Sequence, residues 1–216
     1  MIAHWEIIQG TDEWHQIRYR KIGGTRSKQL LDGSDALMVE LVGESVEEFE
    51  VDHDSYESAD MQRGYELEPI ARERINDKFN IELLPCGWLQ DELLPILGYS
   101  PDGITQDFET MCEIKCPAMK KHTATILSGR IPLDNINQCI HAFAVNPHLK
   151  RLIFASFRPE SIQQLFTYVL TRESEVNIGT ESKPKLFKVS DVVEKINEQA
   201  KLFTHNLRIK VDSLTF

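Results

Sequence analysis

The sequence predicts an α/β protein in which a central mixed β-sheet is flanked by helices on both sides. Short runs rich in β-branched and aromatic residues alternate with longer amphipathic segments, a pattern typical of strands interleaved with helices. The 216 residues, 41% of them hydrophobic, suffice for one domain with a buried core. We therefore expect residues 1–216 to form a single domain.

Capping residues and apolar periodicity predict the helices. Thr11 is placed to cap a helix that carries Trp14 and Arg18 on one face. Thr25, which follows two glycines, can cap a short second helix. Longer segments with apolar residues at helical spacing predict three more helices, Ser58–Phe79, Leu133–Val145 and Val189–Leu207. In the first of these, the predicted apolar stripe comprises Met61, Tyr65, Leu67, Ile70, Ala71 and Ile75.

Six short hydrophobic runs predict the strands. Their bounds are Ile81–Leu84, Gly87–Leu89, Ile96–Tyr99, Met111–Lys115, Leu152–Phe157 and Leu165–Leu170. Pro117 ends the fourth strand, and a polar loop is expected over Asn177–Lys185. The acidic stretch Glu44–Tyr56 has little apolar periodicity and predicts a mobile surface loop, with contact to a basic partner as the alternative.

Two motifs carry the chemistry, Ser100–Gly103 and then Cys112–Pro117. Successive side chains of a strand point to opposite faces, so Glu113 and Lys115 share one face while the residues that alternate with them form an apolar face. Asp102 and Glu113 supply the hard oxygen ligands that Mg²⁺ prefers, and a lysine beside them can hold a water near the metal. This pattern predicts hydrolysis of a phosphate ester. Taken alone, it is also compatible with a turn followed by a solvated strand face.

Two helical segments add candidate site residues. Pro69 directly follows Glu68 inside a predicted helix, where a proline costs about 3 kcal/mol, and such a broken local rule is expected at functional sites. Arg18 stands close to the glycines that precede Thr25, and an arginine with free backbone amides can form a phosphate seat. Each of these residues has an ordinary alternative, an exposed glutamate on a helix or a solvated arginine.

In chain order, Trp-His-x-x-Arg, Gly-x-x-x-Glu, Ser-Pro-Asp-Gly, Glu-x-Lys-Cys-Pro and a later glutamine on a helix, Gln138, resemble the phage lambda exonuclease and YqaJ-type viral recombinase family. This family is a branch of the PD-(D/E)xK nucleases. The resemblance runs from about Trp14 to about Val145 and implies a restriction-endonuclease-like core with a central mixed sheet flanked by helices.

The resemblance assigns metal and catalytic roles by position. Asp102 and Glu113 match the family's metal-binding carboxylates, and the backbone carbonyl of Ile114 is a further expected ligand. Lys115 matches the catalytic lysine that positions or activates the attacking water. Glu68 matches a glutamate that joins the metal cluster, often through water.

The resemblance also assigns a phosphate pocket. Arg18, Thr25 and Ser100 match the family's pocket for a terminal 5′-phosphate, although Thr25 stands where a serine can be found. Trp14 is expected beneath Arg18 or near the DNA end, and Gln138 matches the glutamine that completes the catalytic site. One departure is Ile140, which replaces a second glutamine found in relatives and is expected in the core.

The implied activity is that of a Mg²⁺-dependent 5′-to-3′ exonuclease, with Mn²⁺ as a plausible substitute and one or two ions per site. It degrades one strand of linear double-stranded DNA and leaves 3′ single-stranded overhangs for recombination by single-strand annealing. A homotrimeric ring, a single-strand annealing protein as partner and action in the cytoplasm of a bacterial host are also implied. The alternatives are a site-specific or structure-specific endonuclease of the same superfamily and a non-catalytic protein that binds DNA ends or a partner.

The charge distribution allows DNA binding despite a net charge of −10. Five basic residues and no acidic one fall between Arg18 and Lys28, whereas residues 32–60 contain many acids and neither lysine nor arginine. A second basic group follows the Glu-x-Lys motif: Lys115, Lys120, Lys121 and Arg130. We hypothesise an acidic exterior with a basic groove that steers DNA to the site.

The remaining features concern cysteines and targeting. The four cysteines, Cys86, Cys112, Cys116 and Cys139, show no C-x-x-C pair, so we expect buried reduced thiols and no iron–sulfur cluster or zinc site. No apolar run is long enough to span a bilayer, and the N-terminus lacks the form of a signal peptide. We therefore expect a cytoplasmic protein without membrane contact.

Overall fold

The computed structural model describes residues 1–50 and 59–214. Its helices are α1 (Asp12–Arg18), the short 3₁₀ helix η1 (Gly24–Arg26), α2 (Ser27–Leu31), α3 (Asp35–Val46), α4 (Ala59–Phe79), α5 (Met119–Ser128), α6 (Leu133–Val145) and α7 (Val189–Leu214). Its strands are β1 (Ile2–His4), β2 (Trp88–Gln90), β3 (Gly98–Tyr99), β4 (Gly103–Ile104), β5 (Thr110–Lys115), β6 (Arg151–Phe157), β7 (Leu165–Leu170), β8 (Glu175–Asn177) and β9 (Leu186–Lys188).

The strands form one mixed sheet and two small antiparallel sheets. In the mixed sheet, of order β4-β5-β6-β7, the pair β5–β6 is parallel and the outer pairs are antiparallel. The crossover between β5 and β6 contains α5 and α6. The small sheets are β1-β2-β3 and the hairpin β8-β9. The predicted α/β class with a mixed sheet and helices is confirmed.

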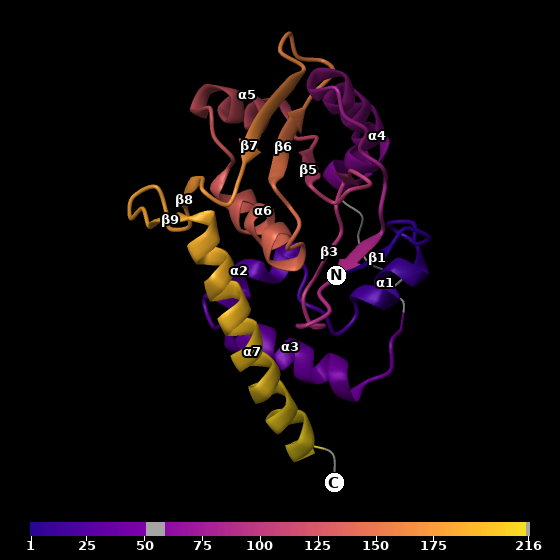
Figure 1. The fold of residues 1–216 in the computed structure, drawn as a ribbon, viewed down its shortest axis with the longest axis vertical. Helices are drawn as coiled ribbons and strands as arrows, with labels where there is room; N and C mark the ends of the chain where they lie inside the picture. The colour runs from indigo at the N-terminus through magenta and orange to yellow at the C-terminus, as the bar shows by residue number, and fades with distance from the viewer. Residues whose placement is uncertain (51–58, 215–216) are drawn as a thin grey trace.

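Helices cover both faces of the mixed sheet, as Figure 1 shows. On one face, Ala71 and Ile75 of α4 pack with Cys112, Ile114 and other strand residues in one buried cluster. On the other face, the larger core joins the sheet to α6. The predicted alternation along β5 is therefore confirmed, because its apolar face meets α4 and the opposite face carries the polar residues.

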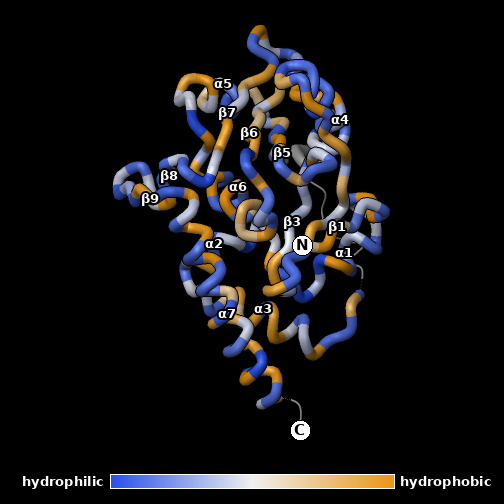
Figure 2. Tube along the Cα trace, in the orientation of Figure 1, coloured by the Kyte–Doolittle hydropathy of each residue, from blue (hydrophilic) through white to orange (hydrophobic). Residues whose placement is uncertain are grey.

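The long helix α7 lies beside α2, α3 and α6 in the lower half of Figure 1. Its buried residues recur at helical spacing: Val189, Val192, Val193, Ile196, Ala200 and Phe203. Figure 2 shows the resulting alternation of hydrophobic and hydrophilic turns along α7. These contacts tie the N-terminal helices, and with them the segment around η1, to the rest of the core.

Several boundary predictions were wrong for identifiable reasons. Residues 81–84 form no strand; Leu84 makes only an isolated bridge to Ile104, and Pro85 cannot continue a ladder. The last helix is longer than predicted and ends at Leu214. Thr25 lies inside η1 and caps nothing, because the turn begins one residue earlier, at Gly24.

Two predictions about polar and apolar surfaces also need correction. Tyr65 and Ile70, placed in the apolar stripe of α4, are exposed, because the buried face of the helix is centred on Ala71 and Ile75. Glu44 belongs to the end of α3 and not to a loop. Ser58 and residues 51–56 of the predicted acidic loop lie outside the described residues, as does the side chain of Met61.

The cysteines are buried, as predicted. All four cysteine thiols are free and buried, and burial raises the pKa of Cys86 to about 11 and the pKa of Cys116 to about 12. Thiols with such pKa values stay protonated near neutral pH. Among the helices of residues 1–50 and 59–214, none is long and apolar enough to cross a membrane.

Candidate active site

Glu113 is the buried centre of the polar cluster on β5. It is fully buried, and each of its carboxylate oxygens accepts one hydrogen bond. Oε1 accepts from Nζ of Lys115, and Oε2 accepts from the hydroxyl of Tyr99 on β3. A carboxylate has about four lone-pair positions, so both oxygens keep capacity for another partner.

Strand pairing brings Asp102 next to Glu113. Gly103 of β4 lies opposite Cys112 of β5, so the residue before β4 meets the strand beside Glu113. Oδ2 of Asp102 accepts a hydrogen bond from the backbone N–H of Ile114 at 2.5 Å. The carbonyl of Asp102 accepts from Nη1 of Arg72 at 2.7 Å, which fixes the Ser-Pro-Asp-Gly turn to α4.

Glu68 approaches the same cluster from α4. Its Oε1 lies over Gly64, 3.2 Å from the point where a Cβ would stand, which accounts for the Gly-x-x-x-Glu spacing. Pro69 lies within the helix and does not end it. Burial raises the pKa of Glu68, and the charge of Glu113 raises it further, against the opposing charges of Lys115 and Arg72.

The three carboxylates repel one another in a buried setting. Burial and then the charges of Glu113 and Glu68 raise the pKa of Asp102 well above its usual range, although Lys115 and the Ile114 N–H oppose this shift. Burial alone lowers the pKa of Lys115, but the charges of Glu113 and Asp102 outweigh burial and raise it. Lys115 is therefore a positively charged ammonium donor. Its single charge does not balance the three carboxylates of the cluster.

The donor set of this cluster fits a hard divalent cation. Asp102 and Glu113 converge as oxygen donors, and their repulsion is what a divalent charge would offset. Within the described residues no group of three or more His, Cys, Asp or Glu side chains forms a metal cage. Mg²⁺ does not need one, because it is usually held by one or two carboxylates and keeps several waters.

Arg18 stacks on Trp14, which bonds to the residue two positions before Asp102. The guanidinium carbon of Arg18 lies 3.7 Å from the centroid of the Trp14 ring. The Trp14 indole N–H donates to the hydroxyl of Ser100 at 2.8 Å and to the carbonyl of Gly87 at 3.1 Å. The prediction that Trp14 packs beneath Arg18 is confirmed, and Ser100 links this stack to Asp102, two residues later.

A pocket of about 370 Å³ opens beside Arg18. It is lined by His15, Arg18, Tyr19, Lys21, Gly23, Thr25, Arg26, Glu44, Phe49, Glu50 and Trp88. Arg18 and Thr25 thus meet in one pocket, whereas Ser100 stays behind Trp14. Burial and then the charge of Arg26 lower the pKa of Arg18 to about 10, so this cation is underpaired and would be stabilised by an anion.

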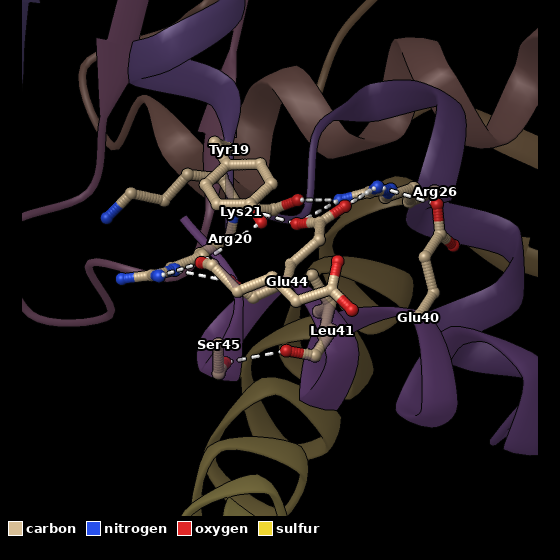
Figure 3. Close-up of polar contacts among 9 residues, drawn as sticks. Tyr19, Arg20, Lys21, Arg26, Glu40, Leu41, Glu44 and Ser45 are labelled. Atoms are coloured by element: carbon tan, nitrogen blue, oxygen red, sulfur yellow. Dashed lines mark hydrogen bonds and ion pairs between the residues drawn. The ribbon is translucent and has the colours of Figure 1, made fainter. Parts of the chain in front are cut away.

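Two neighbouring arginines are engaged by α3 and the residues that follow it, as Figure 3 shows. Arg26 donates to Glu40 and Glu44, and Arg20 donates to the carbonyls of Glu44 and Glu47. The acidic stretch therefore meets a basic partner within its own chain. Across the described part of the chain, Arg18 has no carboxylate partner. Of the two arginines closest to the phosphate pocket, Arg26 is paired with carboxylates, which leaves Arg18 as the arginine available to an anion.

Gln138 of α6 lies against Gly24 of η1, as does Tyr99, which bonds to Glu113. A Cβ added at Gly24 would stand 2.8 Å from Cγ of Gln138 and 3.0 Å from Cε2 of Tyr99. Only glycine fits there, so η1 approaches both side chains closely. Ile140, two residues later, is fully buried, as predicted.

His141, which the sequence analysis missed, holds the same segments together. Its Nε2 donates to the carbonyl of Ile22 at 3.1 Å and to that of Gly98 at 3.2 Å. The Ile22 carbonyl belongs to the segment that leads into η1, and the Gly98 carbonyl belongs to the residue before Tyr99. The sequence signal was its place one turn after Gln138, but a histidine on a core helix is more often a packing residue.

We expect His141 to make the protein acid-sensitive. Burial lowers the pKa of His141 from 6.5 to about 4. The unfolded state binds the proton more tightly than the folded state. The contribution of neutral His141 to the free energy of unfolding is therefore fully present above pH 6.5 and is lost as the pH drops from 6.5 to 4, by about 3 kcal/mol in total. Denaturant unfolding of His141→Gln should show a flatter pH profile over this range. His205→Gln on exposed α7 is the matched control and should keep the wild-type slope; equal slopes in all three proteins would contradict the expectation.

Sequence comparison places these features in a known family. The sequence profile of the YqaJ-like viral recombinase domain matches residues 13–148. The chain belongs to the YqaJ-like viral recombinase family. The match includes the segment from Trp14 to Gln138, in agreement with the predicted resemblance. No curated protein sequence matches this YqaJ-like chain at a significant level.

Solved structures share the fold of this YqaJ-like protein. An alkaline exonuclease, LHK-Exo from Laribacter hongkongensis, is similar with a TM-score of 0.75 and 23% identity, over 94% of this chain and 96% of that one. The same values hold for LHK-Exo in complex with dAMP. A phage-related exonuclease from Haemophilus somnus 129PT has a TM-score of 0.63 and 9% identity, over 90% and 96% of the two chains.

Proposed function

We propose that this protein is a Mg²⁺-dependent 5′-to-3′ exonuclease with a PD-(D/E)xK nuclease core. Its substrate is linear double-stranded DNA with a 5′-phosphorylated end, and its product carries a 3′ single-stranded overhang. The observation that carries the proposal is the Trp14–Ser100 hydrogen bond, which ties the Trp14–Arg18 stack to a residue two positions before Asp102 in the chain. A seat for a terminal phosphate beside a hydrolytic cluster favours attack near a 5′ end. The fold shared with two exonucleases supports this class.

In the proposed mechanism Asp102 and Glu113 would hold Mg²⁺ or Mn²⁺, with the Ile114 carbonyl as a further ligand and Glu68 acting through water. Such an ion would supply Lewis-acid polarisation of the scissile phosphate and stabilisation of the leaving oxygen. The Lys115 ammonium, anchored on Glu113, orients the attacking water together with Gln138. Arg18 and Thr25 bind the 5′-phosphate, and Ser100 supports them through Trp14. This arrangement sets the polarity of digestion.

The assembly follows from the family and not from the site. We propose a homotrimeric ring that encloses DNA, a single-strand annealing protein as partner, and action in the cytoplasm of a bacterial host. Lys120, Lys121 and Arg130, at the exposed start and end of the α5 segment, remain the proposed DNA contacts beyond Lys115. If the ring forms, light scattering of the purified protein should give a mass three times that of the 24.9 kDa chain.

Digestion of matched DNA substrates tests the proposed function. With Mg²⁺, a linear duplex carrying 5′-phosphates should be converted to mononucleotides and 3′-tailed DNA, while a covalently closed circle is spared. EDTA should stop the reaction. Cutting of the circle would indicate an endonuclease, and binding of linear ends without hydrolysis would indicate a non-catalytic end-binding protein.

A further inference from the structure

Tyr99 has a hydroxyl that contacts the candidate metal site although its ring belongs to the core. The residue is 1% exposed, and its hydroxyl donates to Oε2 of Glu113. Lys115 holds the other oxygen of the same carboxylate. Glu113 is thus held at both oxygens, by one donor from its own strand and one from β3. Two donors on separate elements fix the orientation of a carboxylate better than either alone.

The Tyr99 hydroxyl stays a donor near neutral pH. Burial and then the charge of Glu113 raise the pKa of Tyr99 well above its usual value. A neutral phenol beside an anionic carboxylate forms a charge-assisted hydrogen bond, which is stronger than a bond between two neutral groups.

Tyr99 also contacts the segment that lines the phosphate pocket. Its ring edge lies against Gly24, directly before Thr25, at a distance that leaves no room for a Cβ. The next residue, Ser100, accepts the Trp14 hydrogen bond that supports Arg18. Tyr99 and Ser100, adjacent in the chain, therefore contact the two parts of the site. Tyr99 contacts Glu113, and Ser100 contacts Trp14, on which Arg18 stacks.

We propose that Tyr99 is a positioning residue that orients Glu113 for the divalent ion and sets the phosphate pocket at a fixed place relative to it. This inference rests on the proposed function, because it assigns a task within that site. Tyr99 itself contacts neither DNA nor the reacting atoms. The hydroxyl is buried and needs a hydrogen-bond partner, and the partner it has is the carboxylate that the proposal assigns to the metal.

Replacement of Tyr99 by phenylalanine tests the inference. Calorimetric titration of the DNA-free protein with Mn²⁺ should show affinity weakened roughly 10- to 100-fold, the usual effect of removing a group that orients a metal ligand. The kcat for a 5′-phosphorylated duplex should fall by a similar factor, with a smaller change in KM. Tyr168→Phe on β7 removes a hydroxyl outside the site and should match wild type in both measurements.

The outcomes separate this inference from the function on which it rests. Wild-type protein that binds no Mn²⁺ and degrades no DNA would refute the proposed function, and the role of Tyr99 with it. A folded Tyr99→Phe with wild-type Mn²⁺ affinity and kcat, next to an active wild type, would refute the role of Tyr99 alone. Loss of thermal stability without a change in Mn²⁺ affinity would likewise reduce Tyr99 to a packing residue.

A second measurement serves if Tyr99→Phe does not fold. Incorporation of 3-fluorotyrosine at position 99 keeps both the ring and the hydroxyl. Its ¹⁹F resonance should shift when Mg²⁺ is added, because Glu113, which accepts the hydrogen bond of the Tyr99 hydroxyl, gains a divalent cation. A resonance that does not move while calorimetry detects Mg²⁺ binding would overturn the proposal.

Discussion

Lys115→Ala should reduce hydrolysis of 5′-phosphorylated duplex DNA by about 10²- to 10⁴-fold, the range expected when a positioned donor is removed from a transition state. The structure gives the reason: Lys115 is an ammonium donor anchored on Glu113, with 36% of its side chain exposed toward solvent and substrate. Single-turnover kinetics in Mg²⁺ measures the chemical step directly. Binding of DNA ends, followed by fluorescence anisotropy, should survive.

For the same variant we expect metal binding to behave differently from hydrolysis. Lys115 holds a positive charge beside Glu113. Removing that charge takes away a repulsion on an incoming cation, which offsets the lost hydrogen bond, so Mn²⁺ affinity should be unchanged or increased. Lys201→Ala on the exposed side of α7 is the control and should behave as wild type. Residual hydrolysis within threefold of wild type would remove Lys115 from the catalytic role, whatever its effect on the metal.

The parts of the fold with strong periodicity were predictable from the sequence. The bounds of α6 and β7 agree with the prediction residue by residue, because α6 presents a clear apolar period and β7 is a run of β-branched and aromatic residues. The three-residue strands β1, β8 and β9 were missed because so short a run has no detectable period and depends on its tertiary partner. In α5 the buried His122 interrupts the apolar pattern, so this helix was missed as well.

The candidate site was predictable where it depends on period and order along the chain. Alternation on β5 placed Glu113 and Lys115 together, and the turn before β4 placed Asp102 beside them. Tyr99 and Arg72 were missed because their roles depend on which segment faces them. No spacing rule states that a tyrosine before a turn will reach a glutamate on the neighbouring element, or that an arginine will hold that turn.

Arg18→Ala should mainly erase the preference for a phosphorylated 5′ end. Removing one partner of a charged hydrogen bond costs about 1.5–3 kcal/mol, which corresponds to a loss of preference of roughly ten- to hundredfold. Arg18 is singled out because Arg20 and Arg26 are already engaged by α3 and the residues that follow it. The measurement is the ratio of initial rates on duplexes with and without a 5′-phosphate.

The comparison between the two rates is what separates a phosphate seat from a general DNA contact. A general contact would lower both rates together and would reduce the salt dependence of binding, because a phosphate contact anywhere on the duplex releases counterions. A seat for the terminal phosphate should lower only the rate on the phosphorylated end, down to that on the hydroxyl end. Arg208→Ala on exposed α7 should change neither rate. An Arg18→Ala protein that retains the wild-type ratio would remove Arg18 from the phosphate seat and transfer the task to other donors that line the pocket, such as Thr25 and Lys21.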